Sequence, residues 1–214
     1  MVVRLGKVRS NSAIGTHKTS LSGSRRSESW PSADVLAGSV SFRQKAWNAV
    51  MNTETSRLIL RRPLLADVPR LFEFLGDLYA MRYTHVDGTL RQCRRRIAVH
   101  ERRRRREGFA PWTIVSKLDA RIIGWGGLYE DPFEPGWGVE VGYFFDPAYW
   151  GQGYATELTR ACTSLADNVL KLPEVRAFAN PKNIGSQRVL EKTGFQMMRF
   201  IPEMDRLLYY RSRR

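Results

Sequence analysis

The chain has 214 residues, 43% of them hydrophobic, which is enough for one domain with its own core. Its formal net charge of +14 favours polyanionic ligands or partners, such as coenzyme phosphates, RNA or acidic proteins, without selecting one. No apolar run approaches the ~20 residues of a membrane-spanning helix, and the few Cys and His residues lack metal-ligand spacing, so we expect no membrane contact, no metal and a reducing, cytoplasmic location.

Residues 1–50 are rich in Ser and Arg and show neither helical nor strand periodicity. They hold ten serines, and their eight Lys and Arg against Glu28 and Asp34 leave a charge of +6. Such a composition buries too little apolar surface to offset ordering entropy, so we predict a disordered extension before a domain over residues 51–214. Its origin stays open between a mis-assigned start with Met51 as initiator, which we favour, an organelle transit peptide, and a basic polyanion-binding tail.

A strand and two helices are predicted at the start of the domain. Residues 57–62 have the alternation of a strand, which Pro63 stops. Asp67 is the predicted N-cap of the first helix, and Thr89 with Gln92 forms a predicted capping box for the second, which Gly108 ends. The predicted apolar faces are Leu71, Phe74, Leu75 and Leu78 in the first helix, and Leu90, Cys93 and Ile97 in the second.

The second of these helices carries two arginine runs, Arg94–Arg96 and Arg102–Arg106. We expect mainly a solvated helix face, where cations offset the negative end of the helix dipole. Contact with RNA or a ribosome through Arg102–Arg106 is the alternative, although no aromatic residue interleaves for base stacking.

Two further strands, over residues 112–117 and 121–129, lead into an acidic loop over 130–136. Its carboxylates, Glu130, Asp131 and Glu134, contrast with the basic surroundings. They form either a polar hairpin end or a rim that attracts a cationic amine.

The most informative stretch runs over residues 138–170. A strand over 139–145 ends at Asp146-Pro147, and a glycine turn over 150–155 then opens an amphipathic helix. A strand, a glycine turn and a helix N-terminus in sequence form an anion site, because unpaired backbone N–H groups converge there. Glycines allow a phosphate to approach the backbone closely.

The remaining chain predicts a strand over 175–179, a helix over about 183–192 and two antiparallel strands over 195–201 and 206–211. Gly194 is the predicted helix C-cap, with Phe195 packing back. Strands and helices in this order predict a mixed α/β domain.

Two sequence segments resemble one known family. Residues 151–157 (GQGYATE) are similar to the pyrophosphate loop of the GNAT superfamily of acetyl-CoA-dependent N-acetyltransferases, and residues 140–143 (EVGY) to its fourth strand. Residues 183–195 are similar to the family's Asn-x-x-Ser…Glu-Lys-x-Gly-Phe segment. The pattern looks most like the branch of ribosomal-protein N-terminal acetyltransferases. It implies a single GNAT-like domain, whose mixed, mostly antiparallel sheet is flanked by helices.

The resemblance also implies acetyl-CoA as co-substrate, without a metal. Asn183 and Ser186 match positions near the pantetheine arm and the sulfur, and the strand backbone at Phe144 and Phe145 would pair with that arm. The backbone amides that would hold the pyrophosphate are those of Trp150, Gly151, Gln152, Gly153, Tyr154, Ala155 and Thr156.

Glu140 is the candidate general base, because a carboxylate in an otherwise apolar strand is costly and burial raises its pKa. Pairing with a nearby Arg, without catalysis, is the alternative. The tyrosine that many family members use as general acid is missing after residue 186, so Ser186 or water takes that role.

The sequence therefore predicts transfer of an acetyl group from acetyl-CoA to a primary amine, possibly a protein N-terminus. Two alternatives stay open: acetylation of a small amine such as an antibiotic or polyamine, and a non-catalytic module that binds acyl-CoA or RNA. A homodimer is compatible with the sequence, which gives no oligomeric state.

Overall fold

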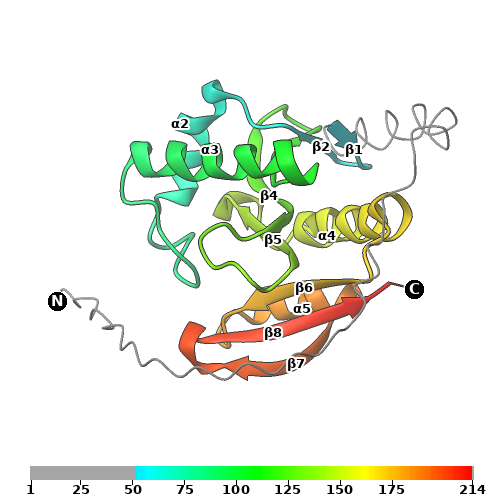
Figure 1. Cartoon of the computed structure of the whole chain (residues 1–214). Helices are drawn as coiled ribbons and strands as arrows, with labels where there is room; N and C mark the ends of the chain where they lie inside the picture. Colours follow the sequence, from blue (N-terminus) through cyan, green and yellow to red (C-terminus); the bar gives the residue numbers. More distant parts are fainter. Residues whose placement is uncertain (1–51, 214) are drawn as a thin grey trace, which may run out of the picture. The chain divides into compact units, whose positions relative to one another are not determined.

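The computed structural model describes residues 52–213 of the chain, which form an eight-stranded mixed sheet with helices on both faces (Figure 1). The predicted extension over 1–50 lies outside the described residues. The strands are β1 Asn52–Glu54, β2 Leu58–Arg61, β3 Trp112–Ser116, β4 Ile122–Glu130, β5 Val139–Phe145, β6 Glu174–Ala179, β7 Gln196–Ile201 and β8 Arg206–Ser212. The α-helices are α2 Val68–Leu75, α3 Leu90–Glu107, α4 Tyr154–Leu165 and α5 Ile184–Lys192.

The strand order is β1-β2-β3-β4-β5-β6-β8-β7, and every neighbouring pair is antiparallel except β5 and β6. The predicted fold class, a mixed and mostly antiparallel sheet flanked by helices, is confirmed. Within the described residues, no helix combines the length and apolarity needed to cross a bilayer.

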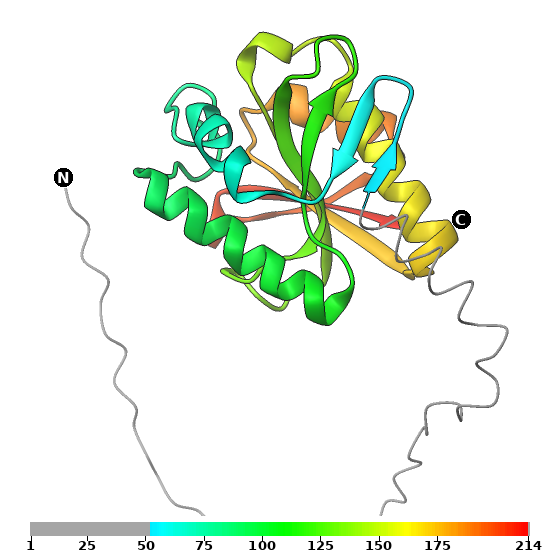
Figure 2. The same ribbon diagram turned by 90° about the horizontal axis from the view of Figure 1, so that it is seen from above.

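Two apolar clusters cover the two faces of the sheet. Figure 2 shows the sheet with α2 and α3 on one side and α4 on the other. Alternation along β5 separates the two clusters: Val141 and Phe145 belong to the α4 and α5 cluster, whereas Phe144 packs against the α2 and α3 cluster. Both clusters are anchored by a buried tryptophan, Trp112 in the first and Trp125 in the second. Glu140 therefore lies on the α2 and α3 face.

The predicted helix ends are largely correct. The Thr89 hydroxyl accepts from the Gln92 amide at 3.2 Å, but within the described residues the return bond of the predicted capping box, from the Thr89 amide to the Gln92 side chain, is not found. Gly108 closes α3 in the left-handed region with φ of 87°. At the end of α5, the Gly194 and Phe195 amides donate to the Glu191 and Leu190 carbonyls, as in a Schellman motif.

Asp67 occupies the N-cap position of α2, as predicted, but its side chain makes no hydrogen bond to the N-terminal amides of that helix. A 3-10 turn, Leu65–Asp67, precedes α2 and directs the carboxylate back to the sheet. There it accepts two 2.7 Å hydrogen bonds from Arg61 and one of 3.0 Å from the Thr113 hydroxyl. Two residues of the predicted apolar faces are also exposed, Leu78 beyond the end of α2 and Leu90 at the start of α3.

The arginine run at the end of α3 does not behave as one solvated surface. Arg104 is buried, and it contacts Glu101 at 2.7 Å and donates to the Ala110 and Pro111 carbonyls at 2.8 and 2.7 Å. Arg102, Arg105 and Arg106 are exposed. The run thus combines a structural residue with surface cations.

We expect Arg104→Ala to lower the free energy of unfolding by about 2–4 kcal/mol, because it leaves the carbonyls of Ala110 and Pro111 without their donor and vacates a buried position. Glu101 keeps its ion pair with Arg62. The matched control is Arg105→Ala, which removes an exposed neighbour and is expected to change stability by less than ~0.5 kcal/mol. Urea unfolding followed by circular dichroism measures both. Equal losses for the two variants would contradict this role for Arg104.

Candidate active site

The parallel strands β5 and β6 are paired at one register position only, Glu140 with Arg176. On its other edge, β5 pairs with β4 along all seven of its residues. Beyond Glu140 the strand therefore has an edge without a strand partner on the β6 side. An extended ligand can pair with such an edge as an added strand, which is the position predicted for Phe144 and Phe145.

The glycine turn at the end of β5 is exposed at residues 150–153. Gly151 and Gly153 adopt left-handed φ values of 75° and 81°, which glycine accepts at no steric cost, and a Cβ at Gly151 would meet nothing within 4 Å. Among the described residues, no acceptor is found for the amides of residues 151–156. The Trp150 amide donates to the Pro147 carbonyl at 3.1 Å, so six of the seven predicted amides remain for a ligand.

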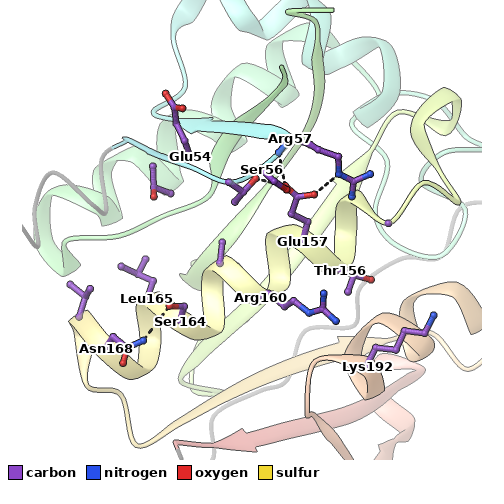
Figure 3. Close-up of a pocket in the computed structure, with 15 residues that line it drawn as sticks. Glu54, Ser56, Arg57, Thr156, Glu157, Arg160, Ser164, Leu165, Asn168 and Lys192 are labelled. Atoms are coloured by element: carbon purple, nitrogen blue, oxygen red, sulfur yellow. Dashed lines mark hydrogen bonds and ion pairs between the residues drawn. The ribbon is translucent and has the colours of Figure 1, made fainter. Parts of the chain in front are cut away.

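Arg57 and Glu157 hold this turn in place from the side (Figure 3). The Arg57 Nε contacts a Glu157 oxygen at 2.7 Å, and its Nη1 donates to the Gln152 carbonyl at 2.8 Å. Since the N–H of a trans peptide points opposite to its carbonyl, the amide of Gly153 is turned away from Arg57. Partial burial raises the pKa of Glu157, but hydrogen bonds from Thr55, Arg57 and Ser56 outweigh it and set that pKa at about 2.

A pocket of about 920 Å³ opens beside the turn, between the β1–β2 hairpin and the outer side of α4 (Figure 3). Thr156, Arg160 and Lys192 line one part of it. Arg160 and Lys192 are exposed and form no ion pair within the part of the chain that the structure describes. The pocket therefore holds two exposed cations close to the first turn of α4.

Glu140 is buried, with 6% of its surface exposed, opposite Tyr129 on β4. Burial raises the pKa of its carboxyl to about 8, the nearby carboxylates of Asp131 and Glu134 add to this, and Arg176 opposes it. Arg176 itself contacts Glu174 at 2.6 Å and the Trp137 carbonyl at 2.7 Å. Across residues 52–213, no ion pair of Glu140 is found, so the alternative of a structural Arg–Glu pair is not met.

Aromatic rings lie on the same side of the sheet as Glu140. The His85 ring lies 5.8 Å from that of Phe144, and the His100 ring lies 5.3 Å from that of Tyr129 and 6.0 Å from that of Phe133. Phe133 belongs to the acidic loop that joins β4 to β5. Of these rings, that of Tyr129 belongs to the residue paired with Glu140 across the sheet.

On the opposite face, β5 meets the N-terminus of α5 through a pair of hydroxyl groups. The Tyr143 Oη lies 2.8 Å from the Ser186 Oγ and donates to the Ser186 carbonyl at 3.2 Å. Burial strongly raises the pKa of Tyr143, which keeps its proton on the oxygen. Asn183 caps α5 by accepting from the Ser186 amide at 3.1 Å.

The sequence did not indicate Tyr143 as a partner of Ser186, because the family resemblance places a tyrosine after residue 186 and not on the strand before the turn. Its spacing of 43 residues from Ser186 gives no sequence signal. Within the described residues, no group of three or more His, Cys, Asp or Glu side chains is placed to hold a metal ion.

Comparison with known proteins gives a consistent result. A family model described as an acetyltransferase (GNAT) domain matches residues 57–196. The uncharacterized protein YkkB of Bacillus subtilis is 29% identical over 160 residues, which are 74% of this chain and 93% of the relative. The probable N-acetyltransferase YjcK of the same organism is 34% identical over 124 residues, 58% of this chain and 66% of the relative.

A solved structure shares the fold at lower identity. The ribosomal-protein-S5-alanine acetyltransferase of Vibrio fischeri superposes with a TM-score of 0.61 at 16% identity, covering 76% of this chain and 96% of that chain.

Proposed function

The chain belongs to the GNAT family of acetyltransferases and is an acetyl-CoA-dependent N-acetyltransferase, and we propose that it acetylates a primary amine with Glu140 as the general base. One observation carries the proposal. Within residues 52–213, six backbone amides without an acceptor lie at the end of the same strand that holds a buried carboxylate without an ion pair. The diphosphate of acetyl-CoA would bind at the end of that strand, and the amine substrate would bind beside Glu140.

Acetyl-CoA supplies an activated acetyl thioester, and this chain's residues would bind and orient it. The amides of residues 151–156 would hold the diphosphate, with the positive end of the α4 dipole behind them. Arg160 and Lys192 in the adjoining pocket are suited to the remaining phosphate. The free edge of β5 at Phe144 and Phe145 would pair with the pantetheine arm.

Glu140 would take the proton that the ammonium must lose before its nitrogen can attack the thioester carbonyl, directly or through a water. A carboxyl with a pKa of about 8 has the proton affinity this step needs near neutral pH. A backbone N–H on the free edge of β5 would stabilise the oxygen that gains charge. When the carbon–sulfur bond breaks, the acetyl group stays on the amine and the thiolate leaves.

Ser186 and Tyr143 would return a proton to that thiolate as a pair. We expect Tyr143→Phe to lower kcat by about two- to tenfold, a modest loss because a thiol of pKa ~8.5 leaves readily without help. Ser186→Ala should have a similar effect, and the double variant should lose no more than the larger single loss. Steady-state kinetics measures this, with Tyr210→Phe on β8 as control. Losses that multiply in the double variant would contradict action as a pair.

The acceptor we favour is a protein N-terminus, because one solved structure with the same fold is named as a ribosomal L7/L12 alpha-N-protein acetyltransferase. An α-amino group titrates near pH 8, and the aromatic rings on the same side of the sheet as Glu140 offer contacts for a first side chain. A small polycationic amine is the second candidate, because Asp131 and Glu134 border the same site.

The test is release of free thiol from acetyl-CoA with a panel of acceptors: peptides that differ in their first residue, the same peptides blocked at the N-terminus, and small polyamines. We expect turnover with free N-termini only. Turnover with polyamines alone would shift the proposal to the second candidate. Binding of acetyl-CoA without turnover of any acceptor would favour a non-catalytic module.

A further inference from the structure

Helix α3 carries nine arginines in 18 residues, and they separate by position on the helix. Three are paired or buried: Arg96 contacts Asp87 at 3.0 Å, Arg103 contacts Glu107 at 2.6 Å, and Arg104 is itself buried. The other six are all exposed, and we refer to them as the arginine stripe: Arg91, Arg94, Arg95, Arg102, Arg105 and Arg106.

The arginine stripe is a repeated pattern. Residues 91–95 and 102–106 both have arginine at the first, fourth and fifth positions, so each member of one triad has a counterpart 11 residues later. Eleven residues are about three turns of an α-helix, which places the two triads on one face, about 16 Å apart along the axis. In each triad the first arginine lies centrally and the other two lie toward either side.

This face is open and holds no exposed carboxylate of its own between the triads. Ala98 lies between them, and a shallow groove of about 550 Å³ follows the face past Arg91, Arg95 and Arg102. Figure 2 shows α3 along the outside of the described part of the chain, with its long outer side uncovered. Within that part, Arg106 contacts Glu107 at 2.9 Å, which also contacts Arg103. No ion pair is found there for the other five arginines of the stripe.

We propose that the arginine stripe binds the phosphate backbone of double-helical RNA. Every cation on it is Arg, whose planar fork matches phosphate oxygens in pairs. A protein partner is disfavoured, because the exposed face between the triads lacks the apolar or aromatic anchors that protein interfaces need. The absence of aromatic side chains from the stripe also disfavours single strands, which bind by base stacking.

We favour RNA over DNA because the centre of this face carries no side chain suited to reading bases: the half-buried Ala98 lies between the two triads. Recognition would then depend on phosphate contacts and groove shape rather than on base edges. A-form RNA offers a wide, shallow minor groove that proteins recognise by shape and phosphate contacts. The two triads would then contact phosphates on either side of that groove.

The experiment is a fluorescence anisotropy titration of the full chain against a labelled RNA duplex of about 20 base pairs, at several salt concentrations. Six phosphate contacts predict that log K falls against log salt with a slope of about −5. We expect R91A/R94A/R95A and R102A/R105A/R106A each to bind about tenfold or more weakly and to lose about three units of that slope.

The matched control is R121A/R188A/R199A, which removes three exposed arginines elsewhere and changes the net charge equally. It also leaves the basic residues 1–50 unchanged, so binding through them would fall equally in all three variants. Thermal melting within about 2 °C of wild type shows that the variants fold.

A drop in the triad variants that is no larger than in the control would overturn the proposal. Equal affinity for a DNA duplex of the same length would overturn the choice of RNA, and displacement of RNA by stoichiometric polyglutamate would indicate an acidic protein instead. None of these readouts depends on acetyl transfer, so the two proposals fail separately.

Discussion

Replacement of Glu140 by Gln is expected to lower kcat by about 10²–10⁴-fold, the usual contribution of a general base, while the dissociation constant of acetyl-CoA stays within about twofold. Gln keeps the shape and polarity of the side chain but cannot accept the amine proton. Because Glu140 lies on the α2 and α3 face, away from residues 151–156, the change should not reach the coenzyme amides. Thiol release measures kcat, and isothermal titration calorimetry measures binding.

The pH dependence supplies an independent readout. With the pKa of Glu140 at about 8, kcat/KM of the wild type should rise with pH through that value, since only the carboxylate accepts a proton. An α-amino acceptor titrates in the same range, so a hydrazide should be used as acceptor. Its nitrogen is unprotonated before attack, and Glu140 then takes the proton that this nitrogen loses as its bond to the carbonyl carbon forms. The rise of kcat/KM near pH 8 should be absent in Glu140→Gln.

The same variant should also be more stable than wild type in alkali. The folded protein keeps a proton on Glu140 up to about pH 8, whereas the unfolded chain releases it near pH 4.5, so this group's contribution is present below pH 4.5 and lost as pH rises through 8. Gln has no proton to lose, and the variant should gain on the order of a few kcal/mol at pH 9.

Exposed Glu203→Gln is the matched control, with no change expected in activity or stability. Full activity in Glu140→Gln would remove the proposed base. Lost activity together with lost stability would indicate a structural role for the carboxylate instead.

The parts of the fold that sequence predicts are those governed by local rules. Proline and glycine mark the ends of β5, α3 and α5, and side chains alternate along β5 as expected. β1 was not predicted, because Asn52–Glu54 are polar and mostly exposed, and only pairing with β2 makes them a strand. The sequence also gives no sign that the helix after the turn changes its winding, whereas the structure has a π-helical turn from Ala166 to Leu170.

The parts that sequence misses depend on distant partners. Asp67 has the local signature of a helix cap, but Thr113, 46 residues away, and Arg61 determine where its carboxylate points. Arg104 and Arg105 are adjacent and identical in type, yet only the first meets the carbonyls of Ala110 and Pro111. In the same way, Glu140 could be predicted as a candidate base from its apolar strand. Only the structure shows that, among the described residues, Glu140 forms no ion pair.

The double variant G151A/G153A is expected to weaken acetyl-CoA binding by about ten- to a hundredfold while kcat at saturation falls little. Both residues have left-handed φ values, which cost a residue with a Cβ roughly 1–2 kcal/mol each. Relief of that cost would rotate the peptides and turn their amides away from the diphosphate. Calorimetry with CoA and kinetics with acetyl-CoA measure the effect.

Gly108→Ala is the matched control, because Gly108 has a φ of 87° and open space around its Cβ position but lies at the far end of α3. It should lose similar stability per residue and keep its affinity for acetyl-CoA. Acetyl-pantetheine, which carries the thioester but no diphosphate, separates binding from a distorted site. If the amides act on the diphosphate, the double variant and the wild type should use acetyl-pantetheine equally well, since neither can hold a group that the substrate lacks. An equal loss with both substrates would place the damage at β5 or Glu140, and the turn would then not be the diphosphate site.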